Sequence, residues 1–109
     1  MTRQWNILLD QTPLILSPFF LQTTPDWDCD ERSFEAFQKS FYSAIYSTSI
    51  NWLSLPAGVV PVGIIEGRPA GVQIIGRRFR EDLILDAMQK IEDRVGVLTE
   101  QLWKKLEMI

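Results

Sequence analysis

Residues 54–81 constrain the fold more than any other part of the chain, because they hold five of the six glycines and three of the six prolines. Two short apolar runs, 59–65 and 70–75, are separated there by Glu66-Gly67. An acidic residue followed by glycine is close to the Asp-Gly sequence of a two-residue type I′ turn, in which Gly67 takes a positive φ. Valine and isoleucine favour strands over a helix. This stretch therefore predicts a β-hairpin.

Both runs of the hairpin are apolar at nearly every position, so we expect both of its faces to be covered by other elements. The rest of the chain offers helices for this purpose. We therefore expect an α/β (α+β) fold in which a sheet containing the hairpin is covered by two or three helices. A chain of 109 residues is expected to form a single domain, 1–109.

The first predicted helix begins near Asp28 or Asp30, either of which can cap it, and ends near Ser49. Its apolar residues recur every three or four positions and predict one buried stripe. That stripe comprises Phe34, Phe37, Phe41, Ala44, Ile45 and Thr48.

A second helix is predicted after Glu81-Asp82, whose charges suit the first turn of a helix. Its expected buried stripe comprises Leu83, Ile84, Ala87, Met88, Ile91 and Val95. Gly96 is placed to end this helix. A short terminal helix should begin at Thr99 and be anchored by burial of the large Trp103 ring.

The segment before the first helix combines apolar runs with turn residues. Residues 7–9 and 14–16 predict an extended strand with a kink at Pro13. The irregular crossing over 17–30 carries four large apolar residues, Phe19, Phe20, Leu21 and Trp27. The favoured interpretation is that they cover the core of a fuller protein. The alternative is that they line a substrate pocket.

Composition limits the possible functions. The net charge of −3 and pI near 4.8 argue against a nucleic-acid partner, which requires a basic face. The chain has no histidine, and Cys29 lies between two aspartates that disfavour its thiolate, so no His-based or Cys-based nucleophile is expected. Asp26, Asp28 and Asp30 alternate like calcium ligands, but the glycine and glutamate of that loop are out of place. We expect no metal and no other cofactor.

A cytoplasmic location is expected from the rest of the composition. A single cysteine forms no internal disulfide, which favours a reducing compartment. We see neither a secretory signal nor an apolar run of the ~18 residues needed to span a bilayer, so we expect no membrane partner. The three arginines of residues 76–80 have two interpretations: an anion site beside a helix start, or ion pairs with nearby acids. We favour ion pairs.

Residues 51–81 resemble the C-terminal part of amidase signature family enzymes. The pattern is Asn-x-x-Gly-Leu-Pro-Ala, then Val-Pro-x-Gly, then Asp-Gly-x-Pro-x-Gly-x-Gln-x-x-Gly, followed by an aromatic residue and Glu. Ser54 stands where the family usually has Gly, and Glu66 where Asp is commoner. Weaker similarity extends the resemblance over about residues 5–95. The matching residues are Asn51, Leu55, Pro56, Ala57, Val60, Pro61, Gly63, Gly67, Pro69, Gly71, Gln73, Gly76, Phe79 and Glu81.

The resemblance implies an amide hydrolase whose C-terminal portion contributes strands to a mixed sheet covered by helices. The family's Ser-Ser-Lys relay lies upstream of the matching region, and this chain has neither a Ser-Ser nor a Gly-Gly dipeptide. We therefore assign no catalytic residue and expect the chain, truncated relative to the family, to be inactive alone. Its expected partner is the missing upstream amidase segment or a second copy of itself. The alternative is a non-catalytic module that pairs through its sheet edge.

Three polar or aromatic residues are candidates for a substrate pocket or a structural role. Gln73 lies inside an apolar strand, so its amide needs partners if buried. Asn51 precedes the turn at Pro56, and Trp27 belongs to the aromatic crossing. For the two amides we favour the structural role, because most buried side-chain amides bond to the backbone.

Overall fold

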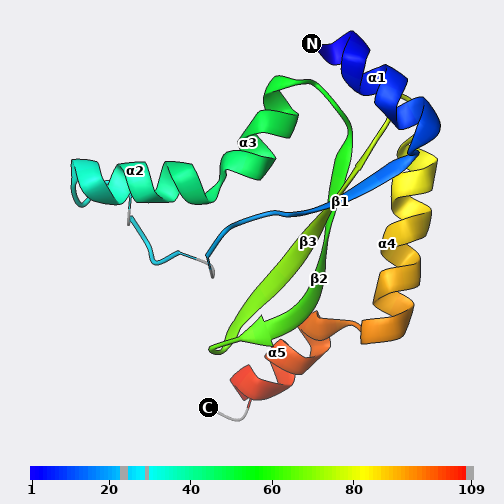
Figure 1. The fold of residues 1–109 in the computed structure, drawn as a ribbon. Coiled ribbons are helices and arrows are strands. Elements are labelled where there is room, and N and C mark those ends of the chain that lie inside the picture. The colour runs from blue at the N-terminus through cyan, green and yellow to red at the C-terminus, as the bar shows by residue number, and fades with distance from the viewer. Residues whose placement is uncertain (23–24, 29, 108–109) are drawn as a thin grey trace.

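The fold of the protein was obtained as a computed structural model, which describes residues 1–22, 25–28 and 30–107 (Figure 1). Within these ranges it contains five helices and three strands, so the α/β class is confirmed. The elements are α1 (Thr2–Gln11), β1 (Leu14–Pro18), α2 (Phe34–Ser43), α3 (Ile45–Trp52), β2 (Ala57–Ile65), β3 (Arg68–Gly76), α4 (Glu81–Val95) and α5 (Leu98–Glu107). The prediction for Cys29 falls outside the described residues.

The predicted hairpin is confirmed as β2 and β3, which pair antiparallel with Val60 opposite Val72. Glu66 and Gly67 both have positive φ, 52° and 78°, as a type I′ turn requires. The pairing register shifts between Pro61 and Gly63, which places a bulge in the middle of β2.

The strand β1 pairs antiparallel with β3 and completes a sheet in the order β1-β3-β2. The extended structure predicted for 14–16 is therefore confirmed. The strand predicted for 7–9 is wrong, because these residues belong to helix α1. A three-residue apolar run fits one helical turn as well as a strand, and Leu9 decides between them by packing against Ile50 and Ile75.

Each face of the sheet carries one apolar cluster. On one face, Val60 and Ile74 pack against Ile84 of α4, and the predicted stripe of that helix is confirmed. Gly58 lies so close to this helix that a Cβ there would overlap the sulfur of Met88. The helix ends at Gly96, with a φ of 86°. The other face is covered by α1 and α3, through Leu9, Ile50, Leu53, Leu55 and Ile75.

The helix predicted from Asp28 or Asp30 to Ser49 is two helices, and its predicted start is wrong. Ser33 caps α2, because its side chain accepts a hydrogen bond from the Ala36 N–H at 3.1 Å. The chain bends at Ala44 (φ −96°, ψ 11°), where the helix changes direction into α3. The bend follows Ser43, whose Oγ donates to the Ser40 carbonyl at 2.7 Å, an arrangement that often bends helices.

The predicted burial of the apolar stripe fails over α2, which projects away from the sheet (Figure 1). Phe34, Phe37 and Phe41 are all exposed, with Phe37 and Phe41 stacked at a ring distance of 6.3 Å. The helix α5 also differs from its prediction: it begins at Leu98, which is buried, while Trp103 is 61% exposed. Trp103 is therefore not an anchor in this chain.

The chain is more open than a compact monomer of its size. Its radius of gyration is 16.0 Å, against about 13 Å for a compact domain of this length. Its accessible surface is 8240 Å², about 2,000 Å² above the value that the size scaling gives for a monomer of 12.6 kDa. Among the described residues, none of the helices is long and apolar enough to cross a membrane.

Candidate functional site

Gln73 occupies the centre of the sheet and is only 3% exposed. Its Nε2 donates to the Oγ of Ser17 at 3.0 Å and lies 3.5 Å from the carbonyl oxygen of Tyr46. Ser17 is also its cross-strand partner in the β1–β3 ladder. The amide therefore connects β3 to β1 and to α3. The sequence indicated that Gln73 needs partners but gave no sign of which residues supply them.

The two partners of Gln73 line an apolar groove between α1, β1 and α3, which has a volume of about 710 Å³. Trp5 lines it from α1, Ile15 and Leu16 from β1, and Ile45 from α3. The groove was not predicted from the sequence, since it needs α3 to turn away from α2 at Ala44. A volume of this size is within the range of small-molecule sites.

Asn51 lies apart from the groove, exposed in the last turn of α3. Its carbonyl oxygen accepts a hydrogen bond from the Ser54 N–H at 3.1 Å. The backbone of Asn51 therefore helps to turn the chain from α3 toward β2.

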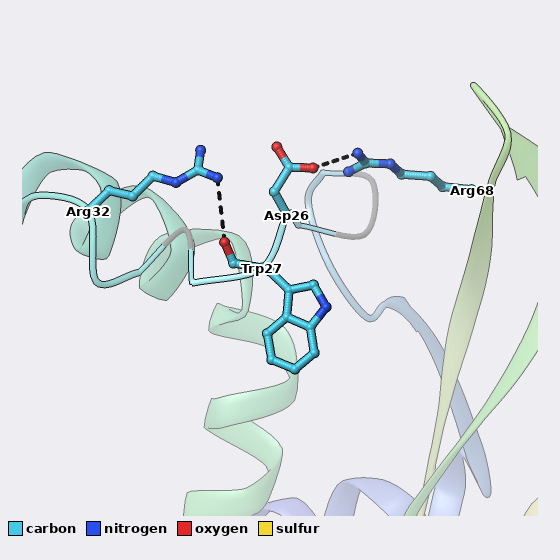
Figure 2. A network of polar contacts seen from close by, with 4 residues as sticks. All are labelled: Asp26, Trp27, Arg32 and Arg68. Carbon is cyan, nitrogen blue, oxygen red and sulfur yellow. Dashed lines mark hydrogen bonds and ion pairs between the residues drawn. The ribbon is translucent and has the colours of Figure 1, made fainter.

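Trp27 is 90% exposed and is not one of the residues that line the groove. Figure 2 shows its indole projecting from the loop while its carbonyl oxygen lies 3.5 Å from Nη2 of Arg32. The loop is held to the tip of the hairpin by Asp26, whose Oδ1 lies 2.6 Å from Nη2 of Arg68 (Figure 2). This hydrogen bond, followed by the charge of Arg68, lowers the pKa of Asp26 below its usual value. Trp27, Asn51 and Gln73 thus lie on three separate elements.

The arginines after β3 pair with acids, as favoured from the sequence. Arg77 bonds to Asp10 at the end of α1, and Arg80 Nε lies 3.0 Å from Oδ1 of Asp82. The Arg80 hydrogen bond lowers the pKa of Asp82, and the same bond raises the pKa of Arg80. All four side chains are about half exposed, so these pairs contribute little to stability.

Within the described ranges, no three His, Cys, Asp or Glu side chains come together to hold a metal ion. Asp26, the first residue of the alternating aspartates, is engaged by Arg68. Phe19 and Phe20 form an edge-to-face pair with ring centres 4.6 Å apart, and they line a small cavity together with Pro69 and Gly71 of β3.

Comparison with known proteins places this chain among amide-cleaving enzymes. It is 42% identical over 106 residues to the indoleacetamide hydrolase of Bradyrhizobium diazoefficiens, a match covering 96% of this chain and 20% of the relative. The corresponding protein of Bradyrhizobium japonicum is 41% identical, with 96% and 23% covered. A glutamyl-tRNA(Gln) amidotransferase subunit of Nitratiruptor sp. is 30% identical over 90 residues, with 83% and 20% covered. No family model matches the chain.

The chain is homologous to the C-terminal portion of amidase signature family enzymes. It spans about a fifth of the length of the curated relatives reported above. The family also accounts for one local feature of the backbone. Ser54, which stands where amidase signature enzymes usually have Gly, has a φ of 56°. Glycine takes this left-handed conformation without the Cβ penalty that Ser54 carries.

Proposed function

We propose that this chain acts as the C-terminal portion of an amide hydrolase, a hydrolase of carbon–nitrogen bonds. The observation that carries the proposal is the 42% identity to an indoleacetamide hydrolase over 96% of the chain. In this role, β1, β2 and β3 extend a larger mixed sheet of the amidase signature fold, with α4 covering one face. Residues 1–109 then form one structural unit of that enzyme.

The chemical groups of the reaction are proposed to come from the larger portion of the enzyme. Residues 1–109 contain no histidine and no Ser-Ser dipeptide, so none of them is assigned as catalytic. The surplus of about 2,000 Å² of accessible surface supports a chain that is covered by other protein when it works. Gln73 is proposed to hold β1 and α3 in place for this contact, and not to touch substrate.

The proposed substrate of the whole enzyme is a small aromatic amide such as indole-3-acetamide. The name of the relatives at 41% and 42% identity supports this class. The amidotransferase relative is less similar, at 30%, and so gives weaker support to a role in glutamyl-tRNA amidation. A cytoplasmic location without a cofactor, nucleic acid or membrane partner is part of the same proposal.

A second function is a non-catalytic module that pairs with another copy of itself or with another protein. The observation in its favour is the open edge of β1, which has a neighbouring strand on one side only among the described residues. A module of this kind would assemble without any amidase portion, whereas the first proposal requires one.

The experiment that separates the two is a chimera. In the Bradyrhizobium diazoefficiens hydrolase, the C-terminal portion that matches this chain is replaced by residues 1–109. Hydrolysis of indole-3-acetamide is compared among the chimera, the unaltered hydrolase, the hydrolase lacking that portion, and residues 1–109 alone. The proposal expects activity from the first two only. A chimera that folds cooperatively but hydrolyses no amide would favour the module.

A further inference from the structure

The two edges of the sheet differ in how well they resist pairing with another strand. The edge strand β2 carries Pro61 near its middle and a bulge beside it, and both features discourage pairing. The other edge strand, β1, has the sequence Leu-Ile-Leu-Ser-Pro, with no charge, no bulge and a proline only at its end. A long-lived free edge of this kind is an aggregation hazard, so β1 has the character of an interior strand.

The apolar groove runs along the same open strand. Residues 15–18 of β1 all belong to its lining, opposite Ile45 and Tyr46 of α3. Leu16 is 66% exposed although it lies in the sheet opposite Ile74. A strand added beside β1 would satisfy its free backbone groups and bring side chains against Leu16 and the wall of α3.

We propose that this groove is a strand-addition site, in which an apolar β-strand from the larger portion of the amidase pairs with β1. The inference rests on the proposed function and specifies where the two portions meet. Main-chain hydrogen bonds to β1 would provide the affinity, and side chains entering the groove would provide the specificity, as in other cases of β-strand addition.

Area and charge both favour this occupant over a second copy or a charged peptide. A standard interface buries about 800 Å² on each partner, whereas this chain exposes about 2,000 Å² more than expected. A partner that covers most of this surplus must be large, and the matched relatives are about five times longer than the aligned region. The lining of the groove contains no charged residue, which disfavours a charged strand.

Amide hydrogen exchange tests the strand pairing directly. Exchange is measured at micromolar concentration for residues 1–109 alone and for the chimera described above. The amides of residues 14–17 that exchange fast in the isolated chain are expected to slow at least tenfold in the chimera. The edge amides of β2 serve as the control and are expected to change less than twofold. Equal rates for β1 in both proteins would overturn the proposal.

A second copy as the occupant has its own signature in the same experiment. If β1 amides in the isolated chain slow as its concentration is raised, β1 pairs with another copy, and the proposed occupant is wrong. The two proposals also fail separately. An inactive chimera with slowed β1 amides contradicts only the proposed function, and an active chimera with fast β1 amides contradicts only the strand addition.

A pair of matched variants tests the groove independently. Leu16→Lys places a charge at the rim of the groove, and Leu85→Lys places one at a similarly exposed leucine of α4, 63% exposed. Neither is expected to change the unfolding midpoint of the isolated chain. In the chimera, Leu16→Lys should reduce kcat/KM or the folded yield at least tenfold, and Leu85→Lys less than twofold. Equal effects of the two variants on the chimera would overturn the proposal.

Discussion

The side-chain nitrogen of Gln73 lies 3.0 Å from the Oγ of Ser17, its partner across the β1–β3 ladder, at a position where the glutamine is almost completely buried. The same nitrogen lies 3.5 Å from the carbonyl oxygen of Tyr46. One amide group thus joins the central strand to both walls of the apolar groove.

Replacing Gln73 by leucine should destabilise the chain by about 1–3 kcal/mol, because the buried acceptors of Ser17 and Tyr46 lose their donor. Urea unfolding measures the change. Gln38→Leu, at an exposed position of α2, is the matched control and should change stability by less than about 0.5 kcal/mol. Equal effects of the two substitutions would mean that the contacts of Gln73 contribute nothing to folding.

Replacing Gly67 by valine should cost about 1 kcal/mol or more, since a β-branched residue is strained at its φ of 78°. The matched control is Gly63→Val, because a Cβ at Gly63 meets no atom within 4 Å and its φ is not in the left-handed region. The midpoint of thermal unfolding is the measurement. A Gly67→Val midpoint equal to that of the wild type would show that the turn does not require a glycine.

The ion pair between Asp26 and Arg68 predicts a pH effect with a definite sign. The pKa of Asp26 is lowered from 3.8 in the folded chain, so the pair stabilises the fold above the unfolded value and is lost as pH falls through the lowered pKa. In Arg68→Ala, the pKa of Asp26 should return toward 3.8. A carboxyl-carbon NMR titration measures it, and an unchanged pKa would mean that the pair does not persist in solution.

The elements that could be predicted from the sequence are those whose partners are local. The turn at Glu66-Gly67 is defined by two residues, and the stripe of α4 repeats over four turns, so both predictions are confirmed. The strand prediction for residues 7–9 is wrong because three apolar residues carry no period. Their helical state depends on contacts of Leu9 with Ile50 and Ile75, which are distant in sequence.

The burial of the aromatic residues could not be predicted from periodicity alone. Phe34, Phe37 and Trp103 have the spacing of core residues, yet all three are exposed in this chain. A periodic stripe indicates that a helix face requires a partner, but it does not say whether the partner lies within the same 109 residues. The groove is likewise a product of the bend at Ala44, which no residue pattern announces.

The exposed apolar surface predicts that residues 1–109 self-associate when they are alone. Phe34, Phe37 and Phe41 form one uncovered face on α2, and patches of this kind recruit other chains. Sedimentation equilibrium at micromolar concentration should give a mass above 12.6 kDa, most simply that of a two-fold dimer. A monomer that stays soluble and binds no hydrophobic dye would show that these surfaces need no cover.

The account depends most on the claim that these residues serve as the C-terminal portion of an amide hydrolase. The direct measurement is kcat/KM for indole-3-acetamide of the chimera that carries residues 1–109 in the Bradyrhizobium diazoefficiens hydrolase. We predict a value within about 100-fold of the unaltered enzyme, a difference of about 2.7 kcal/mol in transition-state stabilisation, with no turnover by residues 1–109 alone. A cooperatively folded chimera without detectable hydrolysis, or hydrolysis by the isolated chain that a single serine substitution abolishes, would contradict it.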